Sequence, residues 1–164
     1  MAGKLPAVKS KLRFSLELNA DHRIGILVSE WHSDITKSLL NAALKVFEQN
    51  GLSKQLITIH VPGSFELPLA ASWLLKKKKI GGAICLGCVI QGETKHDDYI
   101  NHTIAQSISN LCLKFDKPLI YGVITSNNLQ QAKDRSGGKF GNKGEESAIA
   151  LLKMLQIKSI VKSI

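Results

Sequence analysis

The sequence of 164 residues contains no apolar run of the roughly 18 residues that a membrane-spanning helix needs. Its N-terminus lacks the apolar segment of a secretory signal peptide. Only three cysteines are present, an odd number, which argues against a disulfide framework and indicates a reducing compartment. These absences predict a cytoplasmic protein without a membrane partner, and the length suits one domain with a sizeable core.

Acidic and aromatic residues are scarce beside the basic ones. The chain has 22 Lys and Arg residues against 13 Asp and Glu residues, a net charge of +9, and 5% aromatic residues. This balance suits a polyanion partner, a phosphorylated substrate or a lysine-rich surface. We favour the lysine-rich surface and expect no nucleic-acid partner, because no RNA- or DNA-binding signature interleaves the basic residues with aromatic ones.

Buried strands and amphipathic helices alternate along the chain from Arg23 onward. Strands are predicted at residues 24–29, 55–61, 82–90 and 119–125, and helices at 34–50, 65–77, 96–116, 128–136 and 143–156. Ser33 or Asp34 could cap the first of these helices. Such alternation produces a parallel sheet with right-handed crossovers and helices on both faces. Residues 55–61 alternate apolar and polar side chains, as an edge strand does. The predicted fold is therefore α/β, a flavodoxin-like three-layer sandwich with a four-stranded parallel sheet of order 2-1-3-4.

Residues 23–164 are expected to form this single domain, and residues 1–22 a basic N-terminal tail. Within the tail, RFSLEL (residues 13–18) is a candidate extra strand that pairs outside its own subunit. The C-x-x-C of Cys85 and Cys88 lies inside an apolar strand. Its two side chains should point to opposite faces, which excludes a shared metal or redox centre.

Ligands of such sheets bind beyond the carboxyl ends of the strands. Polar segments follow all four predicted strands there: SEWH (29–32), VPGSFELP (61–68), QGETKHDDY (91–99) and TSNN (125–128). In the third segment, Thr94 could cap the following helix with Asp97 as its capping-box partner, and the first amides of that helix would favour an anion. His96, in the first turn, could move protons near neutral pH. The alternative, a plain helix cap with an ordinary first-turn histidine, stays open.

The other segments allow two interpretations each. Trp31 could stack on a flat heterocycle or plug the edge of the core. Glu66 could bind a ligand or supply a charge to a helix N-terminus. Arg135 and Lys143 stand in a glycine-rich region that suits oxyanion binding, although basic loops are common. No metal site is predicted, since His96 and His102 lie six residues apart on a helix and face different directions.

Five ordered blocks of this sequence resemble the lumazine synthase family, and they cover most of residues 23–157. They are VSEWHSDIT (28–36), VPGSFELPLAA (61–71), GCVIQGETKHDDY (87–99), YGVITSNNLQQAKDR (121–135) and GNKGEESA (141–148). The resemblance implies a transferase that works without a cofactor. It would condense 5-amino-6-(D-ribitylamino)uracil with 3,4-dihydroxy-2-butanone 4-phosphate to give 6,7-dimethyl-8-ribityllumazine, phosphate and water, a step of riboflavin biosynthesis.

The resemblance also implies residue roles. Trp31 would stack on the pyrimidine ring, and Glu66 would hold ribityl hydroxyls. Tyr121 would line the pocket of a neighbouring subunit, and His96 would be the proton donor, with Lys143 close by as an accessory residue. Hydrogen bonds to the uracil edge would come from the backbone of Ser64, Phe65, Cys88, Val89 and Ile90. The butanone phosphate would be bound by Glu93, Thr94 and Arg135.

The site would then be complete only between subunits, which predicts a homo-oligomer built from pentamers. The link GGKFGN (137–142) resembles that of family members that form closed icosahedral shells of sixty subunits, so we expect a shell, with riboflavin synthase as a candidate partner. Four positions depart from the family pattern. Tyr121 stands where phenylalanine is usual. His32 replaces asparagine, Gln91 replaces arginine, and Asp97 replaces an aromatic residue.

Two other classes of protein are alternatives to this enzyme. One is a flavin- or lumazine-binding protein that has kept the pocket and lost catalysis, which the presence of both His96 and Arg135 argues against. The other is a basic nucleic-acid-binding module, which would bind polyanions in a salt-dependent way without forming lumazine.

Overall fold

The computed structural model describes residues 22–164, so the predicted tail, apart from its last residue, lies outside the described part of the chain. The strands are β1 (Arg23–Ser29), β2 (Leu56–Val61), β3 (Ile80–Ile90), β4 (Leu119–Ser126), β5 (Ser136–Gly138) and β6 (Gly141–Asn142). The helices are α1 (Ser33–Gln49), α2 (Leu67–Leu75), α3 (His96–Phe115), α4 (Leu129–Arg135) and α5 (Lys143–Lys162). Two 3-10 turns, η1 (Ser53–Gln55) and η2 (Ser64–Glu66), precede β2 and α2.

The main sheet has the predicted parallel order β2-β1-β3-β4. The edge position of β2 is confirmed, and this strand alternates in burial. Strand β3 pairs with β1 only as far as the pair Val28 and Leu86, although β3 continues to Ile90. Its last four residues therefore extend past β1 while remaining paired with β4.

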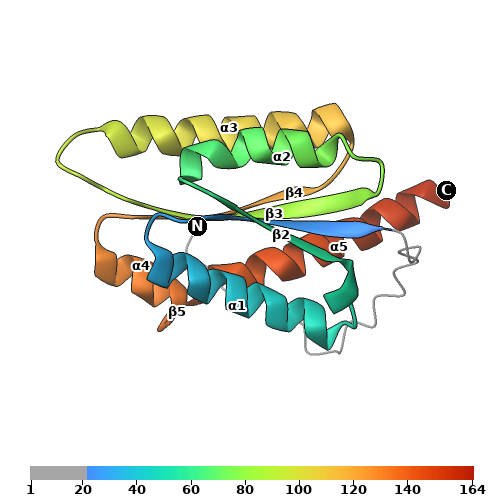
Figure 1. Cartoon of the computed structure of the whole chain (residues 1–164), viewed down its shortest axis with the longest axis horizontal. Coiled ribbons are helices and arrows are strands. Elements are labelled where there is room, and N and C mark those ends of the chain that lie inside the picture. The colour runs from blue at the N-terminus through green and yellow to red at the C-terminus, as the bar shows by residue number, and fades with distance from the viewer. Residues whose placement is uncertain (1–21) are drawn as a thin grey trace.

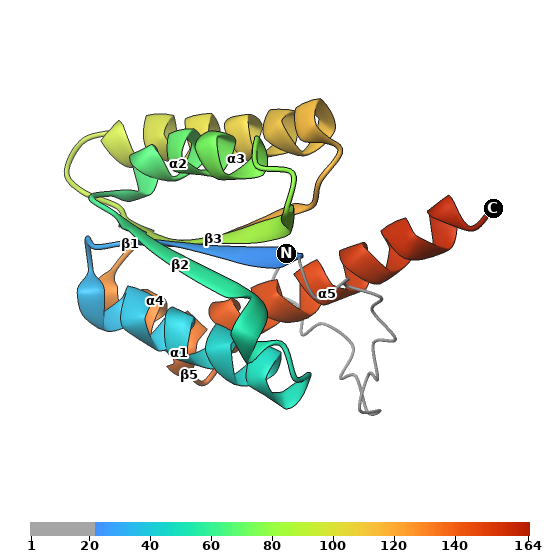
Figure 2. The same ribbon diagram turned by 45° about the vertical axis from the view of Figure 1, so that its right-hand side comes forward.

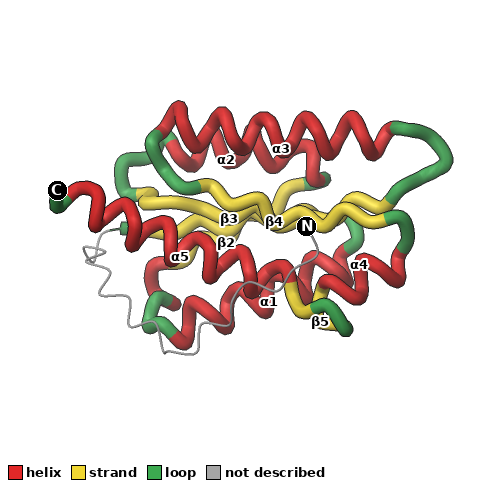
Figure 3. The backbone as a smooth tube through the Cα atoms, turned by 180° about the vertical axis from the view of Figure 1, so that it is seen from behind, coloured by secondary structure: helices red, strands yellow, loops and turns green. Residues whose placement is uncertain are grey.

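Helices α2 and α3 cover one face of the sheet, and α1, α4 and α5 cover the other (Figures 1 and 3). Each face has its own apolar core. Cys85 belongs to the core under α2 and α3, whereas Cys88 belongs to the opposite core. The prediction that the two thiols cannot share one centre is thus confirmed.

Helices α1 and α5 make direct backbone contact at Gly144. A Cβ atom at this position would lie 2.0 Å from the carbonyl oxygen of Leu39, so only a glycine allows the two helices to approach so closely. Asn142 caps α5 by accepting a hydrogen bond from the Gly144 N–H (2.8 Å). This packing fixes the start of α5 against α1, while the C-terminal half of α5 projects past the sheet (Figure 2).

Two predicted helix caps were wrong. Helix α1 begins after His32, which adopts a left-handed conformation (φ 55°), and neither Ser33 nor Asp34 caps it. The His32 carbonyl instead accepts from the Ile35 and Thr36 amides, so the backbone itself closes the first turn. Helix α3 follows Lys95, again without a side-chain cap, which removes the predicted capping box of Thr94 and Asp97. Here the Asp98 N–H donates to the Lys95 carbonyl.

Three element boundaries also differ from the predictions. Helix α2 begins at Leu67, because the turn η2 precedes it. Helix α5 continues to Lys162, since no glycine or proline interrupts the sequence after residue 156. The predicted glycine-rich separator forms the antiparallel pair β5 and β6, which the positive φ values of Gly137 (122°) and Gly141 (82°) permit.

Candidate active site

A cleft of about 340 Å³ lies at the carboxyl ends of β1 and β3, between η2 and the start of α3. Four polar segments follow the strands of the sheet, and each is called here the corner of its strand. Residues from three of these corners share the cleft. It is lined by Trp31, His32, Gly63, Ser64, Phe65, Glu66, Cys88, Val89, Ile90, His96 and Ile100. The cleft combines aromatic and aliphatic walls with a few polar groups, which is typical of a small-molecule site.

The β1 and β2 corners are joined by backbone hydrogen bonds. The Glu30 N–H donates to the Val61 carbonyl (2.9 Å), and the Trp31 N–H donates to the Pro62 carbonyl (3.3 Å). The Trp31 ring is 69% exposed and meets the His32 ring edge-on, with centroids 6.4 Å apart. Trp31 therefore does not plug the core, and its faces are accessible to a flat ligand.

The left-handed backbone of His32 accounts for one departure from the family pattern. Asparagine is the non-glycine residue most at ease in this conformation, and histidine is also enriched there. The substitution therefore preserves the turn that leads from β1 into α1. It replaces an amide with a ring that lies beside Trp31 and lines the cleft.

Ser64 attaches the η2 turn to the sheet. This buried residue lies with Oγ 3.4 Å from Ser29 Oγ and 3.5 Å from the Cys88 carbonyl oxygen. The contacts fix the turn directly above the end of β3. They leave the neighbouring Phe65 side chain 55% exposed at the rim of the cleft.

The overhanging end of β3 supplies backbone donors and acceptors. The Gln91 N–H donates to the Ser126 carbonyl on the β4 side (2.8 Å), and the Cys88 carbonyl faces Ser64 on the other side. Because successive residues of a strand alternate sides, the N–H and C=O of Ile90 also face the side that β1 has left. This edge can pair with a flat amide-like edge of a ligand.

The Cys88 thiol has no acid–base role in this arrangement. Burial raises its pKa to about 11, so the thiol stays protonated at neutral pH. Burial also raises the pKa of the Cys85 thiol, on the opposite face of the sheet. The contribution of Cys88 to the cleft is therefore its backbone and an apolar side chain.

Of the predicted residues at the third corner, which follows β3, only some line the cleft. His96 begins α3, is exposed and lines the cleft. Glu93 and Thr94 lie in the exposed loop before it and are not among the lining residues. The imidazole of His96 is thus the titratable group of this corner that faces the cleft.

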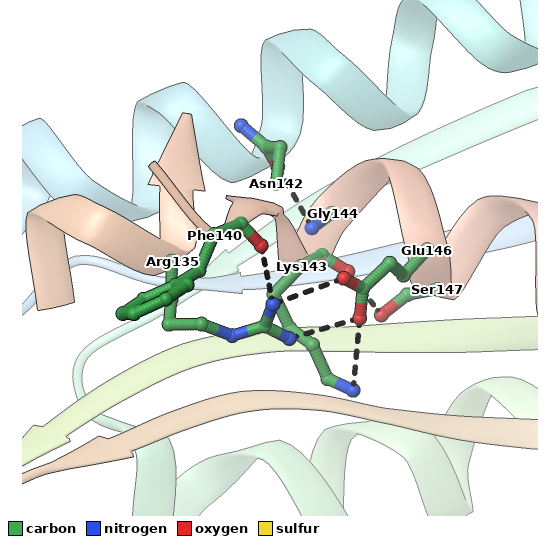
Figure 4. Close-up of polar contacts among 7 residues, drawn as sticks. All are labelled: Arg135, Phe140, Asn142, Lys143, Gly144, Glu146 and Ser147. Atoms are coloured by element: carbon green, nitrogen blue, oxygen red, sulfur yellow. Dashed lines mark hydrogen bonds and ion pairs between the residues drawn. The ribbon is translucent and has the colours of Figure 1, made fainter. Parts of the chain in front are cut away.

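Three further predicted residues lie outside the cleft in the described chain: Tyr121, Arg135 and Lys143. Tyr121 is partly buried in β4, and burial raises the pKa of its hydroxyl. Arg135, at the end of α4, binds the Glu146 carboxylate through both terminal nitrogens (Figure 4). Lys143 lies 3.5 Å from the same carboxylate. Arg135 and Lys143 therefore meet at Glu146, Tyr121 packs against the core under α2 and α3, and none of the three lines the cleft of its own chain.

Sequence reasoning missed three participants: Gly63 and Ile100 in the cleft, and Glu146 beside Arg135. Gly63 could have been found from its position, because it directly precedes the predicted site residues Ser64, Phe65 and Glu66. Glu146 stood in the first turn of a helix, where an acidic side chain is ordinary, so its sequence position gave no distinct signal.

Neither a metal site nor a membrane span is found within residues 22–164. Over that range, no group of three or more His, Cys, Asp or Glu side chains is placed to hold a metal ion. None of the helices described has the length and apolar character needed to cross a bilayer.

Comparison with known proteins relates most of the chain to one family. The family model described as 6,7-dimethyl-8-ribityllumazine synthase matches residues 21–159. The protein of that name from Cytophaga hutchinsonii is 46% identical over 155 residues, which cover 94% of this chain and 91% of the relative. The one from Phocaeicola vulgatus is 44% identical over 142 residues, with 85% and 84% covered. The one from Buchnera aphidicola is 38% identical over 140 residues, with 84% and 88% covered.

Proposed function

The chain belongs to the 6,7-dimethyl-8-ribityllumazine synthase family, and from this premise we propose that the cleft beside Trp31 is where it performs the family's reaction. The protein is an enzyme of riboflavin biosynthesis. It condenses 5-amino-6-(D-ribitylamino)uracil with 3,4-dihydroxy-2-butanone 4-phosphate to 6,7-dimethyl-8-ribityllumazine, phosphate and water. The observation that carries the proposed site is the gathering of an exposed indole, unpaired strand backbone, a carboxylate and an imidazole in one cleft.

The pyrimidine would enter between Trp31 and the end of β3. The indole face offers a stacking surface, and the backbone of Cys88 and Ile90 on either side of Val89 offers donors and acceptors to the uracil edge. The backbone of Ser64 and Phe65 closes this side. Glu66 would then accept hydrogen bonds from the ribityl hydroxyls, since its carboxylate lies beside Gly63 and within reach of the Trp31 ring.

His96 would move protons between the two substrates. The uracil amine adds to the ketone, and water leaves to give an imine. The phosphate group is eliminated, the ribityl-bearing nitrogen attacks the remaining carbonyl carbon, and a second water leaves as the ring closes. Each step needs a proton delivered or removed near neutral pH, which an imidazole can do. The cleft also orients the reactants, which supplies part of the acceleration. Neither a cofactor nor a metal is part of the proposal.

The phosphate group of the butanone would be bound by Arg135 together with Glu93 and Thr94, with Lys143 close by. Neither Arg135 nor Tyr121 lines the cleft of its own chain. This separation supports a site completed by a neighbouring subunit, and hence a homo-oligomer. We propose a pentamer that assembles further into an icosahedral shell in the cytoplasm, with riboflavin synthase as a candidate partner.

A second groove supports the prediction that neighbouring subunits of the oligomer exchange a strand. It has a volume of about 460 Å³ and runs along β2 and α2, with the exposed Trp73 and Leu69 on its wall. Within the described residues, no strand pairs with the outer edge of β2. We propose that residues 23–164 form one domain and that a strand of a neighbouring subunit pairs with this edge; the candidate strand at residues 13–18 lies outside the described residues. Light scattering tests the assembly, since five chains of 17.9 kDa give about 90 kDa and a shell far more.

The direct test of the function mixes the pure protein with both substrates and follows lumazine fluorescence and phosphate release. Catalysed formation of both products is the expected result. Ligand binding without turnover would instead indicate a lumazine-binding protein. Salt-dependent polyanion binding without either product would indicate a nucleic-acid-binding module.

A further inference from the structure

The guanidinium of Arg135 is held at one end by a carboxylate that sequence reasoning did not single out. Nη1 lies 3.1 Å from Oε1 of Glu146, and Nη2 lies 2.9 Å from Oε2, a bidentate pair (Figure 4). Nη1 also donates to the Phe140 carbonyl oxygen at 2.6 Å. Such paired bonds fix the plane of a guanidinium as well as its position.

Glu146 is itself held in place. It lies in the first turn of α5, whose start is fixed by the Asn142 cap and by the contact of Gly144 with α1. Lys143 Nζ lies 3.5 Å from Oε2, the oxygen that also accepts from Arg135. Glu146 is the least exposed of the three charged side chains, at 20%. The carboxylate is therefore a fixed point to which the Arg135 side chain is attached.

The pairing leaves one edge of the guanidinium open. A guanidinium has five N–H donors. Phe140 and Glu146 occupy both donors of Nη1 and one of Nη2. Among the described residues, no acceptor forms a hydrogen bond with Nε–H or with the second Nη2–H, and these two donors lie along the same edge. That edge can accept a second bidentate partner, such as two oxygens of a phosphate group.

We propose that Glu146 is a positioning residue that turns the free Nε and Nη2 edge of Arg135 toward the phosphate group of the butanone substrate. This inference rests on the proposed function, in which Arg135 binds that phosphate. Glu146 does not touch the substrate; it acts through Arg135. Its carboxylate bears the same sign of charge as the phosphate, so its direct electrostatic effect on the substrate is unfavourable.

This opposition of signs makes the proposal testable. If Glu146 served only to neutralise Arg135 and Lys143, its removal would leave two free cations and would strengthen phosphate binding. If Glu146 orients Arg135, its removal weakens phosphate binding in spite of the gained positive charge. Glu146→Gln keeps the side-chain size but puts an N–H donor against Nη2, which breaks the bidentate pair.

The experiment compares Glu146→Gln with Glu145→Gln, which makes the same charge change at an exposed position in the same helical turn. We expect Glu146→Gln to raise the KM for the butanone phosphate about tenfold and to leave the KM for the pyrimidine within about twofold. Glu145→Gln should change neither. A lower or unchanged KM for the butanone phosphate in Glu146→Gln would overturn the proposal.

Two further variants separate the possible failures. Glu146→Asp keeps the charge but withdraws the carboxylate, so it should also raise the KM for the butanone phosphate; an unchanged value would overturn the proposal even if the glutamine variant failed to fold. Arg135→Ala should raise the same KM, and adding Glu146→Gln to it should cause no further rise. If Arg135→Ala has no effect, the phosphate role of Arg135 itself is wrong. If it has the expected effect and Glu146→Gln has none, only the positioning role is wrong.

Discussion

A Cβ atom on Gly63 would lie 2.8 Å from Oε2 of Glu66, so the glycine provides the space in which this carboxylate folds back over the β2 corner. The same atom would lie 3.7 Å from Cδ1 of Trp31. The absence of a side chain at residue 63 therefore allows the indole and the carboxylate to share one wall of the cleft.

Gly63→Ala should displace the Glu66 carboxylate. The backbone at Gly63 is extended (φ −134°, ψ 174°), so alanine fits there without backbone strain and the effect is steric alone. We expect the KM for the ribitylaminouracil to rise several-fold with little change in melting temperature. Gly92→Ala is a suitable control, because its Cβ would meet no atom within 4 Å. Unaltered pyrimidine affinity in Gly63→Ala would argue against the role of Glu66.

Trp31 should report pyrimidine binding directly. The chain has two tryptophans, so a Trp73→Phe variant carries Trp31 as its only indole. Binding of the ribityllumazine product to this variant should quench the indole fluorescence, because the ring stacks on the ligand. Trp31→Ala should weaken product binding by about tenfold, within the range of roughly 1–3 kcal/mol for stacking of a base on an aromatic ring. An unquenched signal at saturating product would show that Trp31 does not stack.

His96→Gln should slow turnover without weakening the binding of either substrate. Proton transfer by a positioned side chain contributes roughly 100- to 10,000-fold in general. We expect the lower end of that range or less, because orientation in the cleft supplies part of the acceleration. Steady-state kinetics with each substrate varied in turn would separate kcat from KM. A loss of affinity at unchanged kcat would assign His96 to binding instead.

The ion pair of Asp116 with Lys158 should make stability depend on pH in the acid range. The two side chains lie 2.7 Å apart, and the hydrogen bond and charge of Lys158 lower the pKa of Asp116. A carboxylate whose pKa is lowered by folding stabilises the protein above its unfolded pKa, about 4, and loses this effect as the pH falls through the folded value.

Asp116→Asn should therefore melt slightly below the unaltered protein at pH 7, with a difference that shrinks as the pH falls below about 4 and disappears once the carboxyl group is protonated in the folded protein. Asparagine suits the left-handed backbone at this position (φ 49°), so the variant tests the charge and not the turn. The Asp116 carboxylate is exposed, and the shift in melting temperature should be small. Thermal melts followed by circular dichroism across this pH range provide the measurement, and a difference that grew on acidification would contradict the assignment.

Sequence patterns predicted the sheet because burial imposes a period on the chain. The continuous apolar run of β3 and the alternation of β2 indicated a central and an edge strand, and both positions were confirmed. Predictions about helix caps failed at Ser33 and Thr94. A residue type that can cap a helix is visible in a sequence, but whether the backbone closes the turn without it depends on the path of the preceding loop.

Those residues of the candidate site that directly follow a strand of the sheet could be predicted from the order of the elements along the chain. Strand ends of a parallel sheet share one edge, so Trp31, Glu66 and His96 could be expected together, although their roles stay predictions. Chain order could not indicate that Arg135 and Tyr121 lie apart from the cleft, because that depends on which direction α4 and β4 present their side chains. The pairing of Arg135 with Glu146 was equally hidden, since it joins two helices across a hairpin.

Hydrophobic periodicity and ordered motifs were enough to predict the strand order, the core on both faces of the sheet and the family, because both are properties of the chain alone. Other features came only from the folded structure. They are the extension of β3 past the end of β1, the space beside Gly63 that the Glu66 carboxylate occupies, and the edge of the Arg135 guanidinium that has no partner among the described residues. These features depend on distances of a few ångströms between segments far apart in the chain. Packing sets such distances, and no local pattern of residues encodes them.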